Sequence, residues 1–172
     1  MNLNWTCNCC GEQFSTLPFA YVFQEPDRWR SIPEAERELR GGLTSDTCII
    51  DGKEFYVRGR LIVPVIDARE PFIWSVWVSL AQKTFDRIVE LWDVEIREIE
   101  PLIFGFLANE IPIYRRTTNL KCSLRLKNAG IRPSVELEHT DHPLSAEQRH
   151  GTTVERVMEI AAIAAGHKQK QS

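Results

Sequence analysis

Two neighbouring stretches of alternating apolar and polar residues constrain the fold of this chain more than any other feature. In residues 54–66 and again in residues 72–80, nearly every second side chain is apolar, and arginine or serine occupies several positions between them. A period of two is typical of strands that cover a hydrophobic core with one face. Residues 47–51 form a third predicted strand, because Asp51-Gly52 is a two-residue hairpin signal leading into 54–66. These segments predict an antiparallel sheet.

Helical patterns occur before and after this group of strands. Residues 33–40 are predicted to form a short polar helix, and capping-box sequences at Ser79 and Thr152 begin two longer helices. Further strands are predicted over 120–126 and 132–138. Because helices and strands do not alternate regularly, the pattern indicates the α+β class. We expect an antiparallel sheet with helices packed on one face and an N-terminal zinc-knuckle-like turn.

The chain has the length of one domain. A chain of 172 residues buries about two thirds of the surface that its unfolded form exposes. We expect a single α+β domain over residues 1–166, in which residues 1–16 form the knuckle-like segment. The polar residues 167–172 are predicted to form a disordered tail.

The N-terminal turn is predicted from Cys7-Asn8-Cys9-Cys10-Gly11. Cys7 and Cys10 form a Cys-x-x-Cys pair, and two thiolates at this spacing can bind one tetrahedral zinc ion at about 2.3 Å each. Gly11 permits a positive φ, which lets backbone N–H groups point toward the sulfur atoms. Cys9 is expected to face away. Since structural zinc needs four ligands and the chain has no second Cys-x-x-Cys pair, two ligands must come from distant residues.

Cys48 and His142 are the predicted third and fourth zinc ligands. Cys48 lies near the predicted hairpin, and His142 lies in a loop that Pro143 keeps extended. Asp46 or Asp141 would orient the second ring nitrogen of His142. The sequence therefore predicts a zinc site that joins the N-terminal turn to two remote segments.

Two other interpretations of these residues remain open. In the first, the N-terminal cysteines bind no metal, Cys48 and Cys122 are small buried residues, and His142 is a loop residue bonded to the backbone. In the second, Cys48 is a nucleophile that His142 and Asp141 activate. Metal analysis separates both interpretations from the zinc site.

A basic run between Glu110 and Glu136 is the second candidate site. No acidic residue interrupts this run, which contains Arg115, Arg116, Lys121, Arg125, Lys127 and Arg132. Its strand face can receive an acidic protein partner or a phosphate-bearing ligand. The alternative is a solvated face whose charges discourage edge pairing. Trp77, out of phase with the apolar residues of its strand, is a further candidate for a ligand or partner surface.

Composition and charge argue against several classes of protein. The formal net charge of −3 argues against a dedicated nucleic-acid-binding protein. No apolar run approaches the roughly 18 residues of a transmembrane helix, and the N-terminus lacks the pattern of a secretory signal. Five cysteines, an odd number with one tight cluster, fit metal ligands or thiols better than a disulfide framework. We expect a cytoplasmic protein that contacts no membrane.

Short motifs in a fixed order span most of the chain. They are Cys7–Gly11, Leu17-Pro18, Ser45–Gly52, Trp74–Leu80, Glu90–Trp92, Asn119–Lys121 and Thr140–Leu144. In this order they resemble a bacterial family catalogued as domain of unknown function 2199. The resemblance implies no particular activity. It favours His142 over His139 as a ligand, because relatives are expected to have a non-ligand residue at the position of His139.

The sequence predicts a binding or interaction module that a structural zinc ion at Cys7, Cys10, Cys48 and His142 stabilises. The alternative is an enzyme, either a zinc hydrolase with an open coordination position or a cysteine enzyme that uses Cys48 and His142. A nucleic-acid-binding knuckle protein is the third hypothesis. Zinc is the predicted cofactor, and no catalytic residue is assigned.

Overall fold

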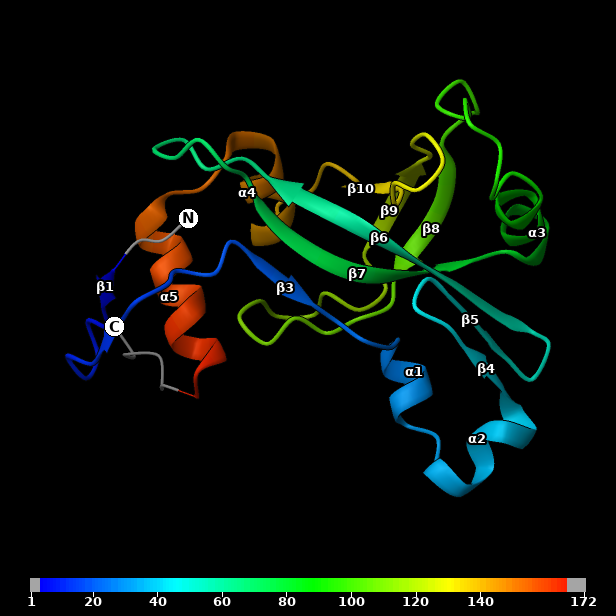
Figure 1. Ribbon diagram of the computed structural model, residues 1–172, viewed down its shortest axis with the longest axis horizontal. Helices are drawn as coiled ribbons and strands as arrows, with labels where there is room; N and C mark the ends of the chain where they lie inside the picture. The colour runs from blue at the N-terminus through cyan, green and yellow to red at the C-terminus, as the bar shows by residue number, and fades with distance from the viewer. Residues whose placement is uncertain (1–3, 167–172) are drawn as a thin grey trace.

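The computed structural model describes residues 4–166 (Figure 1). The strands are β1 (Trp5–Thr6), β2 (Gln13–Phe14), β3 (Ala20–Val22), β4 (Gly41–Leu43), β5 (Thr47–Ile50), β6 (Glu54–Val63), β7 (Phe72–Leu80), β8 (Ile103–Leu107), β9 (Lys121–Arg125) and β10 (Ser134–Leu137). The helices are α1 (Asp27–Arg30), α2 (Glu34–Arg40), α3 (Gln82–Glu90), α4 (Pro143–His150) and α5 (Val154–Ala164). The predicted tail over 167–172 lies outside the described residues.

Five of the strands close into a barrel. Each strand from β6 to β10 pairs antiparallel with the next, and β10 then pairs with β6. This last pair is parallel, because five strands of alternating direction leave the first and the fifth pointing the same way. The chain is mixed α/β with a cysteine-rich N-terminal turn, as predicted. The prediction of a simple antiparallel sheet is wrong, because the sheet curls until its edges meet.

The long hairpin of β6 and β7 organises the other strands. It runs from the pair Phe55 and Leu80 to the pair Val63 and Phe72. The outer edge of β6 pairs with β5 in its first half and with β10 in its second half. The outer edge of β7 pairs with β3 and then with β8. Each edge of the hairpin therefore pairs with two different strands, which diverge from one another (Figure 1).

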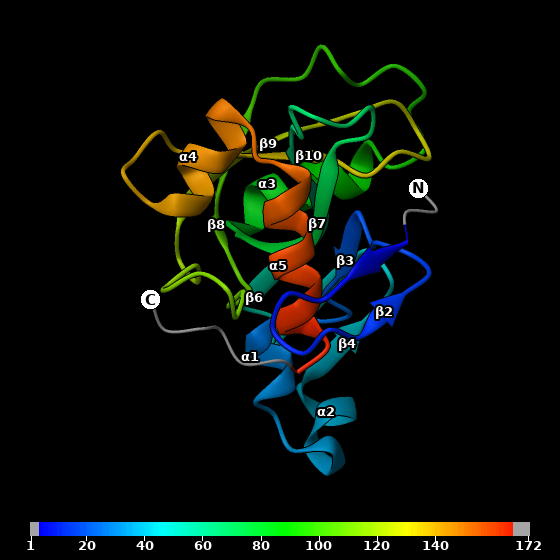
Figure 2. The ribbon, with the colours of Figure 1, turned by 90° about the vertical axis from the view of Figure 1, so that its left-hand side faces the viewer.

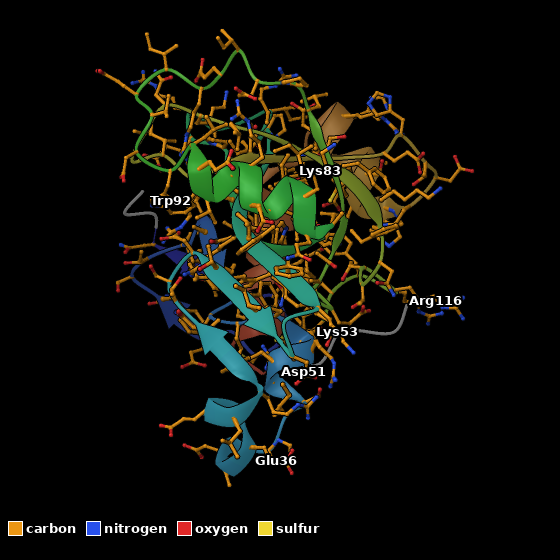
Figure 3. All side chains as sticks on the ribbon, turned by 90° about the vertical axis from the view of Figure 1, so that its right-hand side faces the viewer. Glu36, Asp51, Lys53, Lys83, Trp92 and Arg116 are labelled. Carbon is orange, nitrogen blue, oxygen red and sulfur yellow. The ribbon has the colours of Figure 1, made fainter. Side chains whose placement is uncertain are left out.

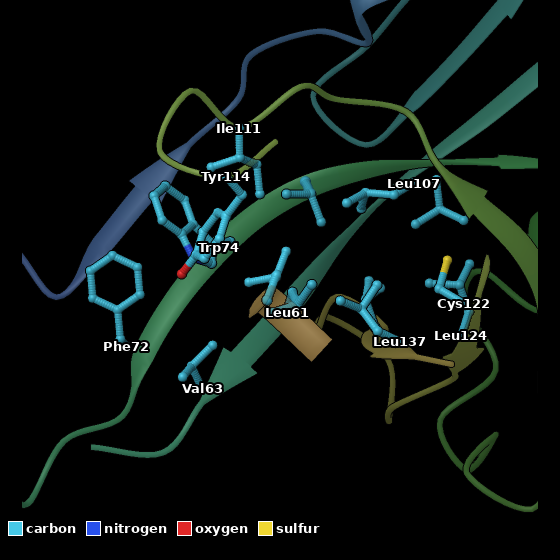
Figure 4. Packing of buried hydrophobic residues seen from close by; sticks show 14 of the residues in the cluster. Leu61, Val63, Phe72, Trp74, Leu107, Ile111, Tyr114, Cys122, Leu124 and Leu137 are labelled. Atoms are coloured by element: carbon cyan, nitrogen blue, oxygen red, sulfur yellow. The ribbon is translucent and has the colours of Figure 1, made fainter. Parts of the chain in front are cut away.

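The main hydrophobic core fills the barrel. Val57, Leu61, Val76 and Leu124 are fully buried, and they point inward from three of its strands. Figure 4 shows Leu61, Leu124 and other core side chains gathered between the strands. Burying such a side chain stabilises the fold by about 1.5–3 kcal/mol relative to leaving it exposed.

A second, smaller core covers the outer face of the β6–β7 hairpin. α1 packs on this face, and β5 extends the sheet beside β6. Their apolar side chains belong to a cluster of Trp29, Ile32, Cys48, Ile50, Tyr56, Trp77 and Ala108. Both faces of the hairpin are therefore buried along part of its length. The predicted partly wet face is apolar at Tyr56 and polar only farther along, at Arg58 and Arg60.

The helices lie on several sides of the barrel. α3 packs against β6, and its Phe85 ring lies 5.2 Å from the Phe55 ring. α4 packs against β6 and β10, whereas α5 lies beside β1, β2 and β3 and contributes Val157 and Ile160 to the main core (Figure 2). The prediction that all helices cover one face is therefore wrong. Within residues 4–166, no helix combines the length and the apolar character needed to cross a membrane.

Local signals predicted the turns and helix starts with mixed success. Asp51 and Gly52 both adopt positive φ, 52° and 61°, which confirms the predicted hairpin turn. Thr153 caps α5 by accepting a hydrogen bond from the Arg156 N–H, one residue later than the predicted cap at Thr152. The predicted cap at Ser79 is wrong, because β7 continues through Leu80 and α3 begins at Gln82.

Candidate metal centre

The three cysteines of the N-terminal turn lie together. Their sulfur atoms are all within 4.8 Å of one another, and the Sγ atoms of Cys7 and Cys9 are 2.8 Å apart. Within residues 4–166, no other three or more histidine, cysteine, aspartate or glutamate residues come close enough to hold a metal ion. We call Cys7, Cys9 and Cys10 the thiol cluster.

Backbone geometry in the turn brings these thiols together. The Gly11 N–H donates to the Cys7 carbonyl, and the Cys7 N–H donates to the Glu12 carbonyl, both at 2.8 Å. Gly11 adopts a φ of 74°, which favours glycine and confirms the positive φ predicted after Cys10. β1 and β2 pair at the base of the turn. The local sequence thus folds into a tight, cysteine-rich turn.

The thiol cluster has one buried and two exposed members. Cys7 is 1% exposed and packs in the main core, whereas Cys9 and Cys10 are exposed. Hydrogen bonding with Cys7 is the largest effect that raises the pKa of the Cys9 thiol to about 11, followed by desolvation and the contact with Cys10. Crowded thiolates repel each other, so a bound cation is needed for them to ionise together near neutral pH.

The predicted position of Cys9 is wrong. We expected it to face away from Cys7 and Cys10, but its sulfur lies with theirs. The knuckle pattern counts only the first and last cysteine, so it passes over a third thiol between them. The adjacent pair Cys9-Cys10 was the sequence signal that could have indicated it.

Cys48 lies apart from the thiol cluster. It is fully buried on β5 in the second core, where Tyr56 and Trp77 also pack, whereas Cys7 belongs to the main core. Burial, with Glu25 and Glu54 nearby, raises the pKa of the Cys48 thiol to about 12. Such a thiol is neutral at physiological pH, which favours packing over ligation or nucleophilic attack. Cys122 is buried in the main core, as predicted.

His142 caps a helix. Its Nδ1 accepts a hydrogen bond from the Leu144 N–H at 3.2 Å, so the proton is on Nε2, which donates to the Arg115 carbonyl at 2.7 Å. Both ring nitrogens are thereby engaged by the backbone. Pro143, which indicated an extended loop before it, occupies the first turn of α4. The structure does not bring His142 into the thiol cluster.

Asp46 and Asp141, the carboxylates predicted to orient His142, do not hydrogen-bond to its ring. Asp46 accepts hydrogen bonds from Arg132 at 2.5 Å and from Ser45 at 2.9 Å. Asp141 is exposed and makes no side-chain hydrogen bond with the described residues. The four-ligand set of Cys7, Cys10, Cys48 and His142 is therefore not assembled, and neither aspartate bonds to the histidine.

The predicted basic surface is divided in the structure. Arg125 lies 3.5 Å from Glu136, and Lys127 lies 3.9 Å from Glu98. Arg116 lies across the molecule from Trp92 in Figure 3. Lys127 lies on the Trp92 side, because its carbonyl accepts a hydrogen bond from Arg97, whose guanidinium lies over the Trp92 ring. Arg115 and Arg116 belong to the connection before β9, whereas Lys121 lies on the outward face of that strand.

Trp77 does not belong to any surface. It is fully buried in the second core, and its indole N–H donates to the Phe23 carbonyl at 2.9 Å. The prediction that its out-of-phase position marks a ligand or partner surface is wrong, because Trp29 of α1 and the other side chains of the second core cover that face of β7.

A family model described as "Uncharacterized protein conserved in bacteria (DUF2199)" matches residues 6–152. A search of curated proteins and a search of solved structures found no match.

Proposed function

The chain belongs to this DUF2199 family of bacterial proteins, and from that premise we propose that it is a binding or interaction module whose thiol cluster holds a metal ion. The observation that carries the proposal is the convergence of three sulfur atoms within 4.8 Å. Thiolates select soft or borderline metals, and zinc is the common metal of thiolate-rich structural sites. Zinc is therefore the proposed ion.

The metal would stabilise a segment that has little other support. β1 and β2 contain two residues each, and residues 8–13, between the buried Cys7 and the partly buried Phe14, are exposed. Cys7 is anchored in the core, beside Trp5, whose ring stacks on Phe14 at 4.7 Å. A metal bound to Cys7, Cys9 and Cys10 would fasten the tip of the turn to this anchor. These three thiolates would fill three of the four tetrahedral positions of a zinc ion and leave the fourth to a water molecule. The proposed role of the ion is to hold the turn, and no catalytic residue is assigned.

The outward face of β8 and β9 supports binding of an acidic protein partner. Phe104 is 55% exposed and Phe106 is 37% exposed, and their rings lie 5.0 Å apart. Phe106 pairs with Lys121, so an exposed cation lies beside the two rings. Aromatic side chains beside a positive charge suit a partner that offers apolar and acidic side chains. We call Phe104, Phe106 and Lys121 the aromatic face.

The thiol form of the cysteines supports a cytoplasmic location, which is part of this proposal. All five are thiols, and Cys48 and Cys122 are buried. A reducing compartment preserves thiols and their metal complexes.

Metal analysis of the purified chain tests the proposal. We expect about one zinc ion per chain by elemental analysis, with zinc–sulfur distances near 2.3 Å by X-ray absorption. Cys9→Ser should lose most of the zinc, because it removes a ligand. Cys48→Ala is the matched control: it removes a cysteine outside the thiol cluster and should leave the zinc content unchanged.

Two results would contradict the metal site. One is a chain that stays free of metal after purification in buffers with added zinc. The other is a Cys9→Ser variant that retains the wild-type zinc content. A loss of zinc in Cys48→Ala but not in Cys9→Ser would instead favour the ligand set predicted from the sequence.

A further inference from the structure

A cavity lies where β5 and β10 diverge along the edge of β6. The Arg58 N–H donates to the Asp46 carbonyl at 2.9 Å, and the Arg60 N–H donates to the Pro133 carbonyl at 2.8 Å. Between these two bonds the neighbouring strand changes from β5 to β10. The cavity has a volume of about 500 Å³, which is within the range of small-molecule sites. We call it the arginine notch, because Arg60, Arg97 and Arg132 line it.

The arginine notch carries more positive than negative charge. Asp46 is the carboxylate in its lining, and it is already bound to Arg132 at 2.5 Å. Arg60 is partly buried, and its side chain makes no hydrogen bond or ion pair with any residue between 4 and 166. Burial is the largest effect that lowers the pKa of the adjacent Arg58, and the charge of Arg132 lowers it further. An anion would offset this local excess of positive charge.

Arg97 adds a buried charge to the notch. It is 3% exposed, and its guanidinium donates to four backbone carbonyls, those of Leu91, Trp92, Lys127 and Ile131. Carbonyl oxygens satisfy the N–H groups but do not neutralise the cation. Within the described part of the chain, no carboxylate pairs with Arg97. These four bonds also hold the wall of the notch in place.

Trp92 supplies an apolar wall. It follows α3 (Figure 3), is partly exposed, and its ring centroid lies 5.7 Å from the Arg97 guanidinium. A guanidinium presents parallel N–H groups that match the two oxygens of a carboxylate or phosphate. An aromatic ring beside such a group suits a ligand with a planar or apolar part.

We propose that the arginine notch binds a small organic molecule that carries an oxyanion, either phosphate or carboxylate. Arg60 contacts the oxyanion, and Trp92 packs against the organic part. Arg97 attracts the oxyanion by its charge from its buried position in the wall of the notch. This site is separate from the thiol cluster, so it does not depend on the metal. The unpaired Arg60 side chain is the group that a ligand would engage directly.

Calorimetric titration of the full chain tests the notch. The probes are inorganic phosphate, citrate and adenosine monophosphate, which separate free phosphate, carboxylate and a phosphate joined through ribose to an aromatic base. We expect Arg60→Gln to weaken binding of the preferred probe about tenfold or more, because it removes a charged hydrogen-bond donor. Since Arg60 has no described side-chain bond, its replacement should leave the melting temperature unchanged.

Arg69→Gln is the matched control. Arg69 is exposed in the loop between β6 and β7 and does not line the notch. The variant has the same change in charge and should bind as the wild type does. Trp92→Leu should weaken adenosine monophosphate more than inorganic phosphate. The proposal is overturned if the wild type binds none of the probes at millimolar concentration, or if Arg60→Gln and Arg69→Gln bind equally well.

Discussion

The side-chain oxygen of Asn109 accepts a hydrogen bond from the backbone N–H of Trp77 at 2.8 Å, and Asn109 is fully buried. The Asn109 amide also donates to the Glu25 carbonyl at 2.9 Å and to the Asp27 carboxylate at 3.2 Å. Trp77 lies on the edge of β7 between the residues that pair with β3 and those that pair with β8. Asn109 therefore satisfies a backbone group that no strand reaches, and it joins β7 to the segment before α1.

Replacing Asn109 with alanine should destabilise the fold by about 2–4 kcal/mol, because it leaves the Trp77 N–H and the Glu25 carbonyl buried without a partner. Urea unfolding measures the loss. Asn128→Ala is the control, since Asn128 is exposed in the turn between β9 and β10 and its replacement should cost less than about 0.5 kcal/mol. Equal costs for the two variants would contradict the bridging role of Asn109.

Gly105→Ala should destabilise the barrel by about 1–3 kcal/mol. A Cβ at this position in β8 would lie 2.5 Å from Val78 Cγ1 and 2.8 Å from the Ser79 carbonyl oxygen, so β8 would have to move away from β7. Gly42→Ala provides the comparison, because a Cβ there meets nothing within 4 Å. Thermal unfolding of the two variants measures the difference. A Gly105→Ala protein as stable as the wild type would show that the two strands can separate without cost.

The stabilising contribution of the Glu110 carboxylate should be lost in acid. Burial raises the pKa of its carboxyl, but hydrogen bonds from Thr118 and Arg116 outweigh burial and hold this pKa below its ordinary value of 4.5. A lowered pKa in the folded state means that the carboxylate stabilises the fold above pH 4.5 and that this contribution is lost as the pH falls through the folded-state pKa. Glu110→Gln should therefore have a lower free energy of unfolding than the wild type near neutral pH, and this difference should shrink in acid.

Unfolding free energies measured across the acid range check the role of Glu110. Glu95→Gln serves as the control, because the Glu95 side chain is exposed and makes no hydrogen bond with the described residues. A difference between the wild type and Glu110→Gln that stays constant with pH would exclude linkage through this carboxylate.

A photoreactive amino acid at position 104 should cross-link a protein partner in bacterial cells, because Phe104 lies on the aromatic face. The same amino acid at position 39 is the control, since Leu39 is more exposed, at 92%, but lies away from the aromatic face on α2. Mass spectrometry should identify a protein with an acidic surface, and Lys121→Glu should reduce its yield. Equal cross-linking at both positions, or none at 104, would count against a partner site on β8 and β9.

Local patterns predicted the strands and the N-terminal turn, but long-range contacts decided the rest. The alternation in 54–66 and 72–80 is visible because each side chain reports its own face of the strand. Closure of the barrel is not visible, because the pairing of Arg60 with Ser134 leaves no local pattern in either segment. Trp77 was misplaced for the same reason: alternation indicates an outer face but not what covers it.

In the candidate site, too, the local part was predicted and the long-range part was not. Cys7, Cys10 and Gly11 are close in sequence, and the turn brings the two thiols together with the predicted positive φ at Gly11. Cys48 and His142 were joined to them on residue type and on their places near a predicted hairpin and in a predicted loop, and neither place reports a contact between distant segments. The structure instead gives each a local role, Cys48 in the second core and His142 as the cap of α4.

The parallel pair of β6 and β10 has a consequence for synthesis of the chain. β6 leaves the ribosome early, but its edge beyond Arg60 has no partner until Ser134 and Val135 have also emerged. During that interval the nascent chain exposes strand edges that can pair with other copies. Products truncated before β10 are left with this edge permanently uncovered, so premature termination favours aggregation.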